Sequence, residues 1–401
     1  MRRRSLLAAP LVAAVVLAGC QGEDPYVAPT PTASVGTPEP AAAATTLETL
    51  ERALRKGDAD AAAALGADAR ASEQLSTAAG NVRRLRLDDL SLRYLSETGP
   101  VAQDGGWVGV VELVWRLRGF DRVAARGEIR VEFPAGGDEI AGVGGGGLLP
   151  LWLSGPVTVR RGPGTLVLAQ GSVTDAERLA AQATLGLQQA DLVLGGNHRV
   201  VVEVPGSSAS LHEAIGQDPG TFDDVAAVTT SADGSLVPGS PVHVFVNPAV
   251  YDDLGDVEAQ VVMTHEVVHA VTDAPLAATA PLWLLEGFAD YVALRDVELP
   301  VSTTAGQIVR QVRRDGLPRA LPGPAEFENS GTHLGAAYEA AWIACVVLAE
   351  RGGEEALVGL YDAVLDGADL DQQLQSRFGW SVGQLTGAWR ARLAALADLT
   401  E

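Results

Sequence analysis

Residues 265–269 read His265-Glu266-Val267-Val268-His269, and the run Trp283-Leu-Leu-Glu-Gly-Phe-Ala-Asp-Tyr291 follows them. In an α-helix, residues four apart lie on one face about one turn apart, so His265 and His269 can reach a single metal ion. Glu266 lies roughly 100° round the helix from His265, where its carboxylate can take a proton from a water beside the ion. The chain has only six histidines, so chance is a poor explanation of this pattern. It predicts a metal centre on a helix.

The second run predicts another helix, which supplies a third ligand. Pro281 stands where a helix opens, since the N–H that proline lacks is not needed there. Glu286 is the only carboxylate between Pro281 and Phe288, in an apolar stretch where an unpaired charge is costly to bury. A metal partner would explain it; the alternative is that Glu286 faces solvent. Asp290, one turn later, can accept a hydrogen bond from the second nitrogen of a ligating imidazole, with Asp273 as the alternative for this role.

These two runs resemble the gluzincin metallopeptidases, and most closely the bacterial peptidase MA-like domains. That family carries H-E-x-x-H on one helix and its third ligand in an E-G-x-A-x-Y-like run on the next, which here is residues 286–291. The spacing of Glu286 and Asp290 is also similar to that in the thermolysin family. The resemblance covers roughly residues 173–395 and implies that His265, His269 and Glu286 bind Zn²⁺. It also implies that Glu266 is the general base.

Two other classes of zinc peptidase fit the sequence less well. Metzincins carry a glycine and a third histidine after the motif, and Thr272 and Pro275 stand there instead. The gluzincin aminopeptidases carry a G-x-M-E-N-like strand that captures the amino group of the substrate, and no upstream segment matches it. The sequence therefore favours an endopeptidase over an exopeptidase.

The resemblance also implies a mechanism and a peptide or protein substrate. Zinc with three protein ligands keeps a position for a water and lowers its pKa to about 7. Glu266 would accept the proton of that water and later pass it to the leaving amine. Tyr338 and His333 are candidates to donate to the oxyanion, because family members often place a Tyr or His in a helix downstream of the third ligand. Alternatively, Tyr338 packs on Trp342, and His333 opens a helix.

The start of the chain has the pattern of a secretory signal. Three arginines at 2–4 precede an apolar run at 6–17, which ends in Leu17-Ala18-Gly19-Cys20. This ending resembles the lipobox of bacterial lipoproteins, which implies that residues 1–19 are removed and that Cys20 is diacylated. An ordinary cleaved signal and an uncleaved anchor are the alternatives, although the apolar run is shorter than the ~20 residues of a membrane span. We expect a lipid-anchored protein on the extracytoplasmic face of the cell membrane.

Charge and the remaining cysteine narrow the classes of partner. The net charge is −22, so repulsion from phosphates argues against a nucleic-acid partner. With Cys20 lipidated, Cys345 has no partner for a disulfide, and its apolar neighbours predict that it lies in the core. His243 alternates with the apolar residues of a strand and is expected to be structural; His198 and His212 lie outside any ligand spacing.

Element order predicts an α+β chain with two domains after a Pro-, Ala- and Thr-rich tether at 20–44. An accessory domain at 45–170, similar to cystatins or nuclear-transport-factor-like domains in element order alone, would hold helices near 46–55 and 58–65, and strands at 82–96, 107–117, 126–133 and a hairpin at 157–168. The boundary could instead lie in the glycine-rich loop 142–147.

The metallopeptidase-like domain, residues 171–401, opens with a capping box at 174–177 and continues as a small mixed sheet and a helical lobe. Its expected strands are 198–204, 225–230 and 242–247, and its expected helices are 256–271, 281–294, 303–314, 334–350, 354–365, 370–378 and 382–396. The resemblance implies that an edge strand binds the peptide, although the sequence does not say which strand is the edge.

Two functions are consistent with these patterns. The first is a membrane-tethered zinc metallopeptidase that acts outside the cytoplasm, with Glu266 as its base. The alternative is a lipoprotein in which a non-catalytic or weakly active peptidase fold serves as a binding or envelope-assembly module.

Overall fold

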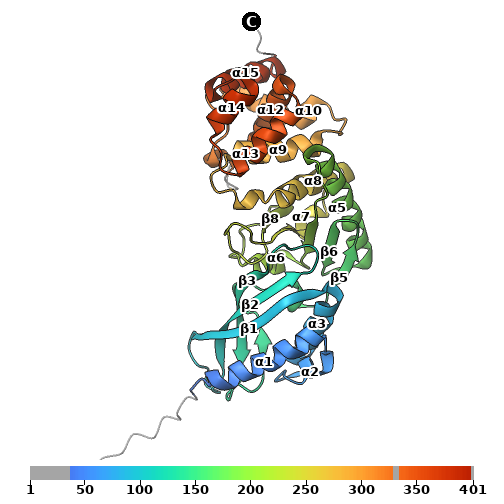
Figure 1. The fold of residues 1–401 in the computed structure, drawn as a ribbon, viewed down its shortest axis with the longest axis vertical. Coiled ribbons are helices and arrows are strands. Elements are labelled where there is room, and N and C mark those ends of the chain that lie inside the picture. Colours follow the sequence, from blue (N-terminus) through green and yellow to red (C-terminus); the bar gives the residue numbers. More distant parts are fainter. Residues whose placement is uncertain (1–36, 328–333, 399–401) are drawn as a thin grey trace, which may run out of the picture. The chain divides into compact units, whose positions relative to one another are not determined.

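A computed structural model describes residues 37–327 and 334–398, and it has the predicted α+β fold, with two separate sheets and a helical lobe (Figure 1). The predicted signal peptide, the predicted lipidation site Cys20 and the candidate donor His333 lie outside the described residues. Within the described residues, no helix is long and apolar enough to cross a membrane.

The N-terminal part consists of three helices and an antiparallel sheet. The helices are α1 (Pro40–Lys56), α2 (Ala59–Ala63) and α3 (Ala69–Leu85), and the strands are β1 (Leu87–Thr98), β2 (Trp107–Leu117), β3 (Ala125–Phe133) and β4 (Gly142–Val143), in the order β1-β2-β3-β4. Apolar residues of both layers form one core, including Leu47, Leu54, Leu75, Val111 and Ile129. A short helix, α4 (Leu151–Ser154), follows this sheet.

Two sequence expectations for this part were wrong in detail, and one helix was not expected. Helix α1 begins at Pro40, so the last residues of the expected tether 20–44 are helical; Pro40 fits because the first turn needs no N–H. Helix α3 was not foreseen, and it takes up residues 82–85 of the expected strand 82–96. Asp68 caps this helix by accepting a hydrogen bond from the Ala71 amide.

The second sheet is mixed and has the strand order β5-β6-β7-β9-β8. Its strands are β5 (Thr158–Arg161), β6 (Thr165–Ala169), β7 (Val200–Val204), β8 (Ala227–Ser231) and β9 (Val242–Val246). The central pairs β6–β7 and β7–β9 are parallel, whereas β5 and β8 pair antiparallel at the two edges. The hairpin 157–168 therefore belongs to this sheet, and a boundary at residue 170 separates it from its partners. The glycine-rich loop 142–147 precedes the whole second sheet, but its first two residues form β4 of the first sheet.

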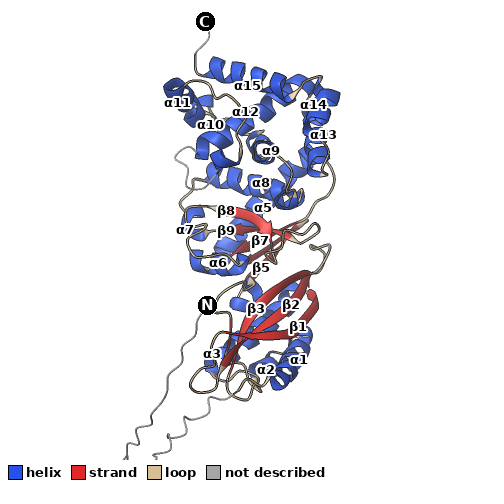
Figure 2. Ribbon diagram, turned by 90° about the vertical axis from the view of Figure 1, so that its left-hand side faces the viewer, coloured by secondary structure: helices blue, strands red, loops and turns tan. Residues whose placement is uncertain are grey.

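The helical lobe lies on one face of this sheet, and the helix α8 lies between the sheet and α9 (Figure 2). The helices after the first sheet are α5 (Val173–Leu194), α6 (Ser208–Ile215), α7 (Pro248–Tyr251), α8 (Asp256–Val271), α9 (Leu282–Leu294), α10 (Val301–Thr304), α11 (Gly306–Asp315), α12 (Leu334–Gly352), α13 (Glu354–Leu365), α14 (Leu370–Phe378) and α15 (Val382–Leu396). Short 3₁₀ turns occupy η1 (Ala274–Leu276) and η2 (Pro324–Phe327). The helix α8 is thus held on two sides by packed elements.

Close packing of α9 on α12 depends on one glycine. A Cβ at Gly287 would lie 2.3 Å from the carbonyl oxygen of Ala341 and 3.0 Å from Sγ of Cys345. Any side chain at 287 would therefore push the two helices apart. Cys345 is fully buried at this contact, as predicted, and burial raises the pKa of its thiol.

Candidate metal centre

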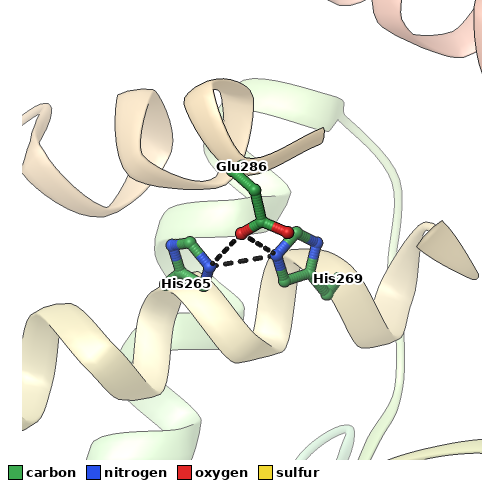
Figure 3. A group of neighbouring side chains, drawn as sticks. All are labelled: His265, His269 and Glu286. Atoms are coloured by element: carbon green, nitrogen blue, oxygen red, sulfur yellow. Dashed lines mark hydrogen bonds and ion pairs between the residues drawn. The ribbon is translucent and has the colours of Figure 1, made fainter. Parts of the chain in front are cut away.

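Two consecutive long helices bring two imidazoles and a carboxylate together. His265 and His269 lie one turn apart on α8, and Glu286 reaches toward them from α9 (Figure 3). Oε2 of Glu286 lies 3.1 Å from Nε2 of His265 and 3.2 Å from Nε2 of His269. The two Nε2 atoms are 3.0 Å apart. In the described part of the chain, this is the one group of three or more such side chains with metal-binding geometry.

The donor set and its spacing fit a zinc ion. Tetrahedral zinc with N and O ligands at about 2.0–2.1 Å places neighbouring ligand atoms about 3.3 Å apart. The three observed separations are within a few tenths of an ångström of that value. Nδ1 of His265 lies 2.7 Å from Oδ1 of Asp290, so this nitrogen carries the donated proton and the Nε2 lone pair is free for a metal.

Electrostatics at the centre favours a cation. Burial by itself would lower the pKa of His265, but the carboxylates of Asp290 and Glu286 outweigh it and raise that pKa well above its usual range. Burial by itself would raise the pKa of Glu286, but the two imidazoles lower it far below its usual range. Positive charge in this buried group is thus stabilised by the carboxylates around it.

The expected partner of the ligating histidine is in place. Asp290, half-buried on α9, bonds to His265 and fixes the orientation of its ring. Asp273, the alternative, was wrong: its Oδ2 lies 2.5 Å from Nη2 of Arg122, and the structure gives it no bond to either histidine. Its backbone has the left-handed φ of 54°, which ends the helical segment just beyond the motif.

Glu266 follows the candidate ligand His265 on α8, and a residue of the neighbouring sheet bonds to it. The hydroxyl of Thr229, on β8, lies 2.6 Å from Oε2 of Glu266 and 3.0 Å from the backbone oxygen of the same residue. Burial raises the pKa of Glu266, although both imidazoles and the bond from Thr229 act to lower it. A carboxylate with a raised pKa is suited to accepting a proton.

Of the two candidate oxyanion donors, only Tyr338 is described. Its ring, on α12, lies 5.9 Å from the ring of His265 and 5.3 Å from the ring of Phe327, centroid to centroid. Burial raises the pKa of its hydroxyl above the usual range, with the charge of Glu286 adding to the effect. Tyr338 is therefore a protonated donor at the edge of the metal centre. Tyr338 and Trp342 line one cavity, which also fits the alternative role in which Tyr338 packs on Trp342.

Two cavities adjoin the group formed by His265, His269 and Glu286. One, of about 490 Å³, is lined by His265, Glu266 and Tyr338, together with the end of the loop that leads into β8. The other, of about 630 Å³, is lined by His269, Glu286 and Thr229, and by apolar residues before and at the start of α9. The candidate metal centre therefore borders two cavities.

The sequence did not reveal a second buried histidine cluster. His243 on β9 is fully buried, with Nδ1 2.7 Å from Oε1 of Glu203 and Nε2 3.0 Å from Oδ1 of Asp121. Burial by itself would lower the pKa of His243, but the two carboxylates raise it to about 10. The alternating apolar pattern of β9 predicted a structural histidine, whereas its partners come from distant segments and carry no local signal.

Comparison of the chain with models of protein families and with curated proteins gave no match.

Proposed function

We propose that this chain is a zinc-dependent metallopeptidase of the gluzincin type that hydrolyses internal peptide bonds. The observation that carries the proposal is the convergence of His265, His269 and Glu286 from two helices, with Glu266 on the adjacent turn. We further propose, from the lipobox-like start alone, that acylation at Cys20 tethers the enzyme to the outer face of the cell membrane.

Each residue at the centre has a distinct task. His265, His269 and Glu286 would hold zinc, which supplies Lewis-acid chemistry by lowering the pKa of a water and polarising the scissile carbonyl. Glu266 takes the proton that the attacking water releases and gives it to the leaving amine nitrogen. Asp290 keeps the proton of His265 on Nδ1 throughout. The Tyr338 hydroxyl would donate to the oxyanion, a type of stabilisation that is often worth about 3 kcal/mol or more.

The edge strand β8 offers a place for the substrate backbone. Among the described strands it pairs with β9 alone, so its outer edge would offer N–H and C=O groups to an extended peptide. Ala227 lines the cavity on the Glu266 side, and Thr229 lines the cavity on the Glu286 side. A peptide paired along β8 would cross the ligand group with side chains on both sides, which supports cleavage within a chain.

The substitution Glu266→Gln tests the proposal. We expect the variant to bind one zinc per chain, as the wild type does, and to lose hydrolysis of a peptide library by at least about 100-fold, the lower range for a general acid–base group. Zinc content by elemental analysis and cleavage by mass spectrometry are the two measurements. Glu355→Gln, at an exposed position on α13, is the matched control and should keep full activity.

A zinc-loaded wild type that cleaves no peptide in the library would sink the enzyme proposal. The binding or envelope-assembly module would then be the better description of the same fold. A chain that binds no zinc would contradict both the metal assignment and the mechanism.

A further inference from the structure

Thr229 is a strand residue whose side chain faces the metal-binding helix. Along β8, residues 227, 229 and 231 are buried and residues 228 and 230 are half-buried, the alternation expected of a strand with one face against a helix. The Thr229 side chain therefore points to α8, where its hydroxyl meets Glu266. The position is fixed by the sheet, because Thr229 lies opposite Val244 in the β8–β9 register.

The Thr229 hydroxyl can bond to Glu266 in more than one way. It has one proton and two lone pairs, and it lies within hydrogen-bond distance of two oxygens of Glu266. It can donate to Oε2 of the carboxylate at 2.6 Å. When the carboxyl group carries a proton, the same hydroxyl can accept from it and donate to the Glu266 backbone oxygen at 3.0 Å. One side chain thus serves the base before and after it takes a proton.

This contact is the one hydrogen bond to the Glu266 carboxylate in the described part of the chain. A carboxylate without it would have several side-chain rotamers of similar energy, and only some would point to the water beside the metal. The bond comes from a paired strand and not from a loop, so it limits Glu266 to a narrow range of positions.

We propose that Thr229 is a positioning residue that holds the general base Glu266 in its reactive orientation, an inference that rests on the function proposed above. It acts through Glu266: in the described part of the chain, the side-chain hydrogen bonds of His265, His269 and Glu286 go to one another and to Asp290, and none goes to Thr229. Its loss should therefore lower the rate of the chemical step and leave zinc binding unchanged.

Two substitutions separate the hydroxyl from the shape of the side chain. Thr229→Val keeps the shape and removes the hydroxyl, and Thr229→Ser keeps the hydroxyl and removes a methyl group. Thr165→Val is the matched control, because Thr165 is a fully buried strand threonine on β6 whose hydroxyl bonds to that of Thr184. The full chain is loaded with zinc, and kcat, KM, zinc content and the unfolding midpoint are measured for each variant.

We expect Thr229→Val to lose about 10- to 100-fold in kcat, the range for partners that orient groups at a metal site, with KM and zinc content unchanged. Thr229→Ser should keep kcat within about threefold of the wild type, and Thr165→Val should do the same. A purely structural threonine would instead show parallel losses in unfolding midpoint and zinc content.

The inference is overturned if Thr229→Val keeps the kcat of an active wild type, or if Thr229→Ser loses as much as Thr229→Val. These outcomes leave the proposed function intact. An inactive zinc-loaded wild type overturns the proposed function and this inference with it, so the two failures are distinct.

Discussion

Two of the described clusters bury histidine against more than one carboxylate or imidazole, and they differ in where the ring nitrogens point. At the metal centre, Nε2 of both His265 and His269 faces one oxygen of Glu286, so three donor atoms converge on one point. In the sheet, the single ring of His243 uses its two nitrogens on opposite sides, one for Glu203 and one for Asp121. The same residue types thus form a candidate metal site in one region and a buried charge network in the other. The two clusters are distinguished by the direction in which their ring nitrogens point, and not by their residue composition.

The largest expected effect comes from removing a ligand at the candidate metal centre. His269→Ala removes one of three ligands, so zinc affinity should fall by more than the roughly 10- to 100-fold that loss of an outer partner costs. Equilibrium dialysis against a chelator, followed by metal analysis, measures it. The parallel substitution His243→Gln should leave one zinc per chain; equal loss of zinc in both variants would erase the distinction between the clusters.

The second prediction concerns stability and its dependence on pH. His243→Gln leaves two buried carboxylates without their cation and should lower the free energy of unfolding by about 3–5 kcal/mol at pH 6. Because the folded-state pKa of His243 is raised from 6.5 to about 10, its stabilising effect is fully present below pH 6.5 and is lost as the pH rises through 10.

Urea denaturation of wild type and His243→Gln between pH 6 and 10 measures this loss. The difference between the two proteins should shrink steadily across that range. A constant difference would mean that the histidine is neutral in the folded protein and that its two bonds are ordinary ones.

The smallest expected effect tests the role of Asp290, the carboxylate that bonds to His265. Asp290→Ala removes the group that orients His265 and should weaken zinc binding by about 10- to 100-fold without unfolding the chain. Asp273→Ala is the control, since Asp273 pairs with the exposed Arg122 and a surface pair is worth about 0–1 kcal/mol. Competition titration with a zinc chelator compares the two, and similar affinities would remove the special role of Asp290.

Local periodicity explains which parts of this structure were predictable. His265, His269, Glu286 and Asp290 follow helical spacing within two adjacent segments, so their convergence could be predicted from the sequence. The α+β class and most helices of the lobe followed from the same kind of pattern.

The remaining contacts depend on pairing between distant segments. Thr229 reaches Glu266 across 37 residues, and Asp121 reaches His243 across 122. Both contacts depend on the order of strands in the sheet, which also places β8 at the edge. Local periodicity in the sequence does not determine that order. The hairpin 157–168 was assigned to the wrong sheet for this reason, because its partner β7 follows a 22-residue helix.

Gly287 gives the site a dependence on a position that has no side chain. At Gly287, the space between α9 and α12 has room for a hydrogen atom but not for a Cβ atom. Glu286 immediately precedes Gly287 on α9. A methyl group at 287 would move the whole of α9, so a ligand oxygen would be displaced without any change in ligand identity. The position of the Glu286 carboxylate and the spacing between α9 and α12 therefore depend on the same residue, and a larger side chain at 287 would change both.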